Sequence, residues 1–318
     1  GAWEDEVLAA RIEAFQPRWL EDLCMAGELV WGRLGLRPPE DDSRPRRGAA
    51  MPSRATPITF ALREDLPWLL QAARGDSVPE EPGHGAARQV LDALRAEGAL
   101  FHSELRARTG RLPVEVEEGL WDLVARGLVT ADGFQAVRAL LSARQTWQRR
   151  HRQEVRRRVG GRRAPTVRQG GEGRWALLPV GAGFDDPDEL AEQVAGQLLA
   201  RWGVVFYDLV ALETLALPWR QLLWALRRLE ARGIARGGRF VNGFAGEQFA
   251  LPEAVDALRR VRRSPHDGQT VTINGADPLN LTGVILPGPR VPAVRTNRIT
   301  YRDGAVAVAE PAAAGPTA

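Results

Sequence analysis

The sequence contains no lysine: all 43 residues counted as Lys or Arg are arginine, against 40 Asp and Glu. A P-loop needs the lysine of its GxxxxGK[ST] motif, so ATP is not held by such a loop here. Schiff-base chemistry through a lysine amine, as in PLP enzymes and lysine-dependent DNA lyases, is excluded too. These exclusions hold even though we attribute the missing lysine to the codon preference of a GC-rich genome.

Cysteine, histidine and long apolar runs are also scarce. The single Cys24 excludes an internal disulfide and a cysteine-cluster zinc site, and it favours a reducing compartment. The four histidines lie far apart, so we expect no metal site and no cofactor in the chain. No apolar run approaches the ~18 residues of a spanning helix, and the acidic start GAWEDEVL is unlike a signal peptide. We therefore expect a cytoplasmic protein without a membrane partner.

Arginine is concentrated in one segment. Residues 144–174 contain eleven arginines and two glutamates, a net charge of +9 within a chain of +3, which leaves −6 on the remainder. Residues 134–159 lack Gly and Pro and predict a long helix, whereas the following Gly-rich stretch predicts a linker. Such a block predicts phosphate contacts without sequence preference, although a solvated helix face is an alternative for part of it.

An internal repeat is the strongest organisational signal. The pattern Leu-x-x-Leu-x-x-x-Gly, followed by apolar residues, occurs three times, with its glycine at Gly27, Gly127 and Gly233. It predicts a helix with one apolar face, a glycine stop with positive φ, and then a strand. In the two later copies this helix (113–126 and 218–232) follows two others and precedes a predicted hairpin. Three helices and a two-stranded hairpin are typical of a winged helix.

The patterns predict a mostly α fold with small β elements: tandem winged-helix (helix-turn-helix) modules and a C-terminal β-barrel-like module. The predicted segments are a partial winged helix (1–36), a linker (37–56), a winged-helix domain (57–143), an Arg-rich helix and linker (144–174), a second winged-helix domain (175–263), the β-barrel-like module (264–310) and a disordered tail (311–318). The strands predicted in the β module are residues 270–274, 284–286, 291–294, 297–302 and 305–308, with Asp303-Gly304 as a hairpin turn.

Two strings near the C-terminus carry a family resemblance, GEQFALPEAV at 246–255 and ADPLNLTG at 276–283. Together with the opening WEDEVLAARIEAFQPRWLEDLCMAGELVW and with GRWALLP at 173–179, they resemble the C-terminal region of Lhr, "large helicase-related" proteins. The resemblance implies ATP-dependent 3′-to-5′ DNA-repair helicases whose C-terminal winged-helix array is similar to AlkZ-type DNA glycosylases. The sequence has no Walker A motif and no DExH box, so ATP and Mg²⁺ would bind helicase domains that this chain lacks, joined to it in cis.

The candidate DNA contacts lie on the last winged helix and in the arginine block. In the winged helix they are Trp219, Arg220, Gln221, Arg227 and Arg228 on its third helix and Arg236 and Arg239 on its hairpin. In the block they are Arg149, Arg150, Arg156, Arg157, Arg162 and Arg163. Tandem winged helices also pack on one another or on partner proteins, which is the alternative for any one of these residues.

The candidate catalytic residues are Asp277, Asn280 and Asp303. Cleavage of a glycosidic bond builds positive charge on the sugar, which a carboxylate can stabilise after the base is flipped into a pocket. The alternatives are an Asx-type turn before Pro278 and a hairpin turn at Asp303. Glu247 and Gln248 are further candidates to line a cleft. The Gln-x-Gln or Gln-x-Asp motif of AlkZ-type glycosylases has no clear copy here.

Three hypotheses follow for function. The first is the DNA-binding C-terminal region of an Lhr-type repair helicase, nucleoid-associated in the cytoplasm, with duplex, forked or single-stranded DNA as partner. The second is an enzyme, a metal-independent monofunctional DNA glycosylase acting on uracil or a damaged base. The third is an oligomerisation scaffold, in which winged helices self-associate into a homo-oligomer.

Overall fold

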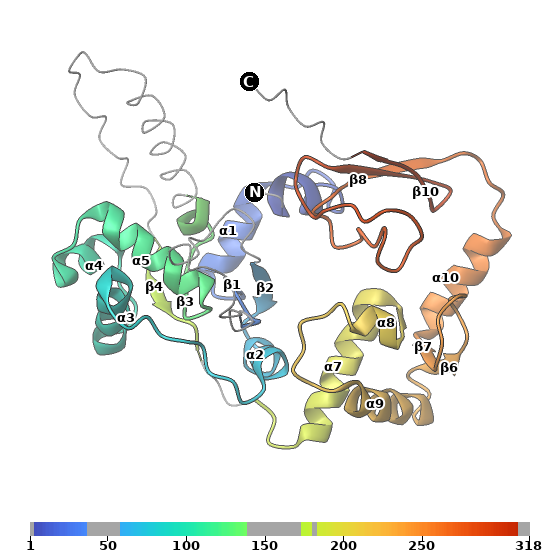
Figure 1. Ribbon diagram of the computed structural model, residues 1–318, viewed down its shortest axis with the longest axis horizontal. Coiled ribbons are helices and arrows are strands. Elements are labelled where there is room, and N and C mark those ends of the chain that lie inside the picture. Colours follow the sequence, from blue (N-terminus) through green and yellow to red (C-terminus); the bar gives the residue numbers. More distant parts are fainter. Residues whose placement is uncertain (1–2, 37–57, 139–172, 180–182, 311–318) are drawn as a thin grey trace, which may run out of the picture. The chain divides into compact units, whose positions relative to one another are not determined.

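The computed structural model describes residues 3–36, 58–138, 173–179 and 183–310. They belong to two compact units (Figure 1). Unit A is Pro17–Gly183, and unit B joins Gly1–Gln16 to Phe184–Ala318. Each unit is described below by itself.

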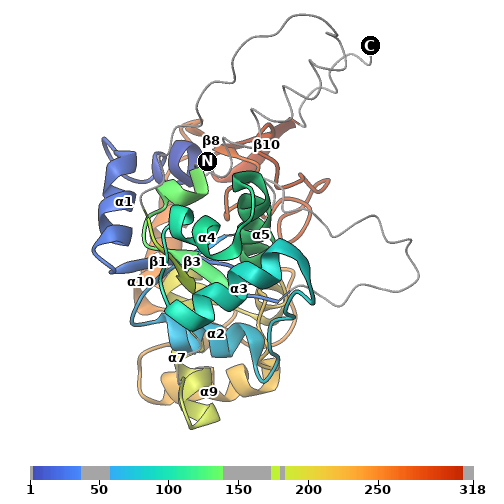
Figure 2. The same cartoon turned by 90° about the vertical axis from the view of Figure 1, so that its left-hand side faces the viewer.

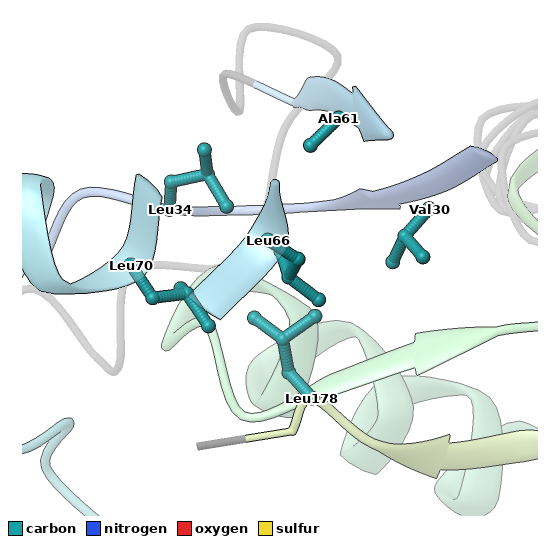
Figure 3. Packing of buried hydrophobic residues seen from close by; sticks show 6 residues of the cluster. All are labelled: Val30, Leu34, Ala61, Leu66, Leu70 and Leu178. Carbon is teal, nitrogen blue, oxygen red and sulfur yellow. The ribbon is translucent and has the colours of Figure 1, made fainter. Parts of the chain in front are cut away.

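Unit A begins with a helix and two paired strands. Its first elements are α1 (Pro17–Met25), β1 (Leu29–Gly32), β2 (Thr59–Leu62) and α2 (Leu66–Arg74). β1 and β2 are antiparallel, with Leu29 opposite Leu62. β1 and β2 lie on opposite sides of the predicted 37–56 linker and therefore belong to one sheet. The sequence had assigned them to two different predicted domains. Figure 3 shows the core beneath them, formed by Val30, Leu34, Ala61, Leu66, Leu70 and Leu178.

A winged helix follows in unit A (Figure 2). Its elements are α3 (Gly85–Glu97), α4 (His102–Thr109), α5 (Pro113–Ala125), β3 (Val129–Ala131) and β4 (Trp175–Leu177). β3 pairs antiparallel with β4, and Leu100 bridges to Trp175, which completes the three-stranded pattern of the fold. The tight turn predicted after β3 does not return the chain as an adjacent hairpin, because the partner strand comes from 175–177. The arginine block thus connects the two paired wing strands, and of the predicted 134–159 helix only the helical residues 135–138 are described.

Unit B contains the second complete winged helix. Its elements are α7 (Pro187–Trp202), β5 (Val204–Val205), α8 (Tyr207–Val210), α9 (Trp219–Ala231), β6 (Arg236–Gly238), β7 (Gln248–Ala250) and α10 (Pro252–Arg263). The Asp186 carboxylate accepts the Asp188 N–H at 2.8 Å and so caps α7, which has Pro187 at its first position. The sheet order β5-β7-β6 places the strand after the wing in the centre.

The predicted glycine stops are confirmed. Gly27, Gly127 and Gly233 have φ values of 76°, 72° and 76°, and follow α1, α5 and α9. Glycine adopts this left-handed conformation without the steric cost of a Cβ atom, so the chain can leave each helix and enter the next strand.

The C-terminal module of unit B is an open sheet. β8 (Thr270–Asn274), β9 (Arg298–Arg302) and β10 (Ala305–Glu310) are antiparallel in the order β10-β9-β8. These described strands do not close into a barrel, so the barrel-like prediction is not confirmed. The Asp303-Gly304 turn is confirmed, with φ values of 49° and 79°.

Two predicted strands of this module, 284–286 and 291–294, are not strands. Only an isolated bridge joins Thr282 and Leu286 there. Proline at 287, 289 and 292 removes N–H donors that a sheet needs. Asparagine side chains bind carbonyl groups of this segment instead: Asn280 donates to Val291 O at 3.0 Å, and Asn297 to Pro292 O at 2.9 Å.

The acid stability of unit A is expected to depend on His102. Burial and the nearby Arg106 lower the pKa of this imidazole below 6.5, against a hydrogen bond with the Pro113 backbone. Below that pH the unfolded chain takes up a proton while the folded imidazole stays neutral, so stability is lost on acidification. We expect the urea midpoint to fall less in His102→Gln than in the wild type between about pH 7 and about pH 5.5. Exposed His84 supplies the control. Equal losses in the wild type, His102→Gln and His84→Gln would contradict this assignment.

Across the ranges that the structure describes, no helix is both long and apolar enough to cross a membrane.

Candidate nucleic-acid interface

The outer face of α9 carries arginine and an exposed tryptophan. The helix buries Leu222, Ala225, Leu226 and Leu229, which turns residues 220, 224 and 227 to the opposite side. Arg220 is exposed, and Trp224 is 52% exposed. The Arg227 guanidinium lies 5.3 Å from the centre of the Trp224 ring, within cation–π range. A large indole held at the surface in this way can stack on a base or a sugar.

Trp219 and Trp224 differ from the sequence prediction. Trp219 is half-buried and packs edge-on against Tyr207, with ring centres 5.8 Å apart, whereas Gln221 is exposed. Trp224 was not among the residues predicted from the sequence. Its position four residues after Arg220, opposite the leucine face of α9, is the signal that could have identified it.

Ion pairs divide the predicted arginines into two groups. Arg227 pairs with Glu247 at 2.8 Å, and Arg228 lies 3.3 Å from both Asp188 and Glu192. These acids already compensate the charge of the two arginines. Arg220, Arg236 and Arg239 are exposed and form no ion pair with any residue that the structure describes. Among the arginines predicted to contact DNA on α9 and the wing, these three are the most available to phosphate.

The wing between β6 and β7 is fixed by a buried glutamine. Oε1 of Gln248 accepts the N–H groups of Phe240 and Val241, both at 2.8 Å, and its Nε2 donates to Val241 O at 2.8 Å. At 0% exposure, Gln248 lies inside the domain and does not line a cleft. The side chain of Glu247, paired with Arg227, is 49% exposed. Gln248 therefore fixes the backbone of the loop that carries Arg239.

Asp277 is enclosed by an ion pair and a turn. Nη1 and Nη2 of Arg11 each donate to one of its carboxylate oxygens at 2.8 Å, and Leu279 N–H donates to Oδ1 at 2.9 Å. The Asp277 side chain is only 2% exposed, and its hydrogen bonds raise the pKa of Arg11. The Asx-type turn that the sequence left as an alternative is thus present.

The three predicted catalytic residues do not form one site. Asn280 donates to Gly275 O at 2.7 Å within the turn of Asp277. Asp303 accepts Gly268 N–H at 3.1 Å near the start of β8, whereas Asp277 follows the end of that strand. β8 lies between these positions and its five residues span about 13 Å, beyond the ~5–9.5 Å of paired glycosidase carboxylates.

A set of ion pairs ties the N-terminal segment to the C-terminal module of unit B. Arg295 reaches Asp5 at 2.8 Å, and Arg298 reaches Glu6 at 2.7 Å. The hydrogen bond from Arg298 lowers the pKa of Glu6. With the Arg11–Asp277 pair, they hold the π-helix η1 (Trp3–Leu8) against β8. These contacts between the N-terminal segment and the C-terminal module were not predicted from the sequence.

The structure supplies no contacts for the arginine block and no cluster of metal ligands in the described ranges. Arg149, Arg150, Arg156, Arg157, Arg162 and Arg163 lie outside the described residues, so their role remains a prediction. For a metal, no group of three His, Cys, Asp or Glu suited to an ion occurs in the described ranges.

The comparisons with known proteins fit this architecture. Two family models described as "Large helicase-related protein, winged-helix domain" match residues 185–270 and 1–44. These segments are therefore similar to the winged-helix domains of Lhr proteins. The resemblance in the sequence is thereby confirmed, and the 185–270 match includes the exposed α9 face and the wing.

Two curated relatives cover nearly the whole chain. "Lhr helicase/uracil glycosylase" of Escherichia coli (strain K12) is 27% identical over 96% of this chain and 20% of its own length. "Lhr helicase/ probable uracil glycosylase" of Mycolicibacterium smegmatis (strain ATCC 700084 / mc(2)155) is 30% identical over 91% of this chain and 19% of its own. The chain thus spans about one fifth of the length of these relatives.

Proposed function

We propose that this chain is a DNA-binding winged-helix region of an Lhr-type repair helicase, working in cis with a motor outside this sequence. The observation that carries the proposal is the exposed surface of α9 and the wing, where Arg220, Arg236 and Arg239 have no acidic partner among the described residues. In winged-helix proteins the third helix and the wing are the elements that approach DNA.

The side chains on this surface have distinct roles in the proposed contact. Arg220, Arg236 and Arg239 bind phosphates, and guanidinium geometry suits two phosphate oxygens. Trp224 stacks on a sugar or an unpaired base, while Arg227 and Glu247 hold its ring in place. Phosphate contacts of this kind position a duplex or a fork without reading its sequence.

Fluorescence anisotropy with labelled duplex and forked DNA tests the proposal. Arg220→Gln/Arg236→Gln/Arg239→Gln is expected to bind about tenfold more weakly than the wild type and to lower the slope of log affinity against log salt by about 0.9 per lost contact. Arg228→Gln is the matched control, because Asp188 and Glu192 already compensate that charge. The proposal fails if the wild type does not bind DNA, or if triple variant and control bind like the wild type.

A second candidate, glycosylase activity, is supported by the names of both curated relatives, which include uracil glycosylase. Asp277 is its candidate acid, although Arg11 occupies both carboxylate oxygens, so a substrate would have to displace that guanidinium. The test is incubation with uracil-containing DNA and alkaline detection of abasic sites. Activity lost in Asp277→Asn, with DNA binding and Asp303→Asn activity kept, would support it; absence of abasic sites would reject it.

The third hypothesis, a scaffold, is the reading left if the chain neither binds DNA nor produces abasic sites and forms a concentration-dependent homo-oligomer in sedimentation.

A further inference from the structure

The last helix of the winged-helix domain in unit B is anchored at its start and exposed at its end. Val255 of α10 is buried with Phe206, Leu209 and Ala250, and Leu251 N–H donates to Gly203 O at 2.9 Å. From residue 258 to the end of the helix at 263, every residue is exposed. Figure 1 shows α10 as the connection between β7 and the C-terminal sheet. The second half of α10 is therefore a fixed extension of the domain that carries α9.

This exposed half concentrates positive charge. Its sequence is Leu-Arg-Arg-Val-Arg-Arg, and within the described part of the chain only Arg259 forms an ion pair, with Asp256 at 3.3 Å. Arg260, Arg262 and Arg263 form no ion pair with the described residues. Arginines at spacings of three and four repel one another by a few tenths of a kcal/mol per pair. The negative end of the helix dipole offsets part of this repulsion.

The arginines share one side of the helix. At about 100° per residue, residues 259, 260, 262 and 263 fall within about half of the circumference, opposite Ala257, Leu258 and Val261. Arg259, Arg260 and Arg263 also line a shallow groove with Asp256, Ser264 and Pro265. Several forked guanidinium groups along one groove suit a ligand that carries repeated anionic oxygens.

We propose that the arginine face of α10 is a second phosphate-binding surface, which holds a nucleic-acid strand beyond the reach of α9 and the wing. It rests on the proposed DNA binding and extends it to a new surface. A membrane fits less well, because the exposed apolar residues of α10 are the aliphatic Leu258 and Val261, without the aromatic side chains common in interfacial helices. The direct link from β7 into α10 instead places this surface on the domain that would bind DNA.

The test compares Arg260→Gln/Arg263→Gln with the wild type on forked DNA. Glutamine has nearly the helix propensity of arginine, so α10 keeps its structure, and circular dichroism checks this. The slope of log affinity against log salt is negative, and we expect it to become less steep by about 1.8, the value for two lost phosphate contacts. Arg95→Gln/Arg108→Gln is the matched control, because Glu81 and Glu97 pair with these arginines, and it is expected to bind like the wild type.

The outcomes separate the two proposals. If the wild type binds DNA, the α9 and wing variant weakens binding, and Arg260→Gln/Arg263→Gln binds with the wild-type affinity and salt slope, then only the α10 proposal is overturned. If the wild type does not bind DNA, both proposals fall. Binding to phosphatidylserine vesicles that needs Arg260 and Arg263, with unchanged DNA affinity, would assign this surface to a lipid headgroup and overturn the proposal.

Discussion

Gln248→Leu is expected to lower the free energy of unfolding of unit B by about 3 kcal/mol. The substitution removes three hydrogen bonds, each worth ~1 kcal/mol, and leaves the N–H groups of Phe240 and Val241 without their acceptor. Leucine fills a similar volume inside the domain, so the loss reflects the polar contacts more than a cavity. The wing would then separate from β7, and DNA affinity would fall with it.

Urea unfolding and hydrogen exchange measure this effect. The amides of Phe240 and Val241 are expected to lose protection in Gln248→Leu, while those in the core of α9 keep theirs. The matched control is Gln221→Leu, at an exposed glutamine of α9, with an expected change within ~0.5 kcal/mol. Equal stability of the two variants would show that Gln248 does not hold the wing.

Arg11→Ala is expected to destabilise unit B by about 2 kcal/mol. It leaves the Asp277 carboxylate, 2% exposed, without its cation. Removing one member of a fully buried pair costs ~3–5 kcal/mol; the value here is smaller because the Arg11 side chain is 38% exposed and solvent screens the pair. The N-terminal segment would also lose one of the ion pairs that hold it to the C-terminal module.

A second substitution separates the charge of Asp277 from its shape. Arg11→Ala/Asp277→Asn is expected to regain part of the lost stability, because a neutral amide needs no cation and its oxygen can still accept Leu279 N–H. Arg18→Ala, at an exposed arginine, serves as the control and should change stability by less than ~0.5 kcal/mol. If the double variant is less stable than Arg11→Ala, the buried charge is not the cause of the loss.

Local signals predicted much of the fold. These signals include the helix stops at Gly27, Gly127 and Gly233 and the turn at Asp303-Gly304. Each depends on the conformational preference of one or two residues, so it can be predicted from a short stretch of sequence. The three-helix pattern and the Lhr resemblance followed from the same kind of signal, with apolar spacing on each helix and matching strings.

Pairing between distant segments could not be predicted in this way. β3 finds its partner in β4, across the arginine block, and Arg11 meets Asp277 across 266 positions. Neither contact can be predicted from a short stretch of sequence, because each depends on how the elements between the two partners pack. For the same reason, Asp277 and Asp303 could be proposed together although β8 separates them.

The candidate interface shows the same division. The arginines of α9 and the wing could be named from sequence, but their availability depends on acids that fold beside them, such as Glu247 next to Arg227. Trp219 was predicted to contact DNA and Trp224 was not, yet Trp219 is half-buried and Trp224 is exposed. The buried leucine face determines which side of α9 is exposed, and the prediction did not take that face into account.

Photo-crosslinking from position 224 tests the central claim most directly. A benzophenone side chain replaces Trp224 on the exposed face of α9, and a second protein carries it in place of Val78, which is 80% exposed in unit A. With both proteins bound to labelled forked DNA, irradiation is expected to link position 224 to a DNA strand, with a yield that falls as salt rises, and to link position 78 weakly or not at all. A protein that binds DNA but crosslinks no better from position 224 than from position 78 would contradict the claim that α9 and the wing face DNA.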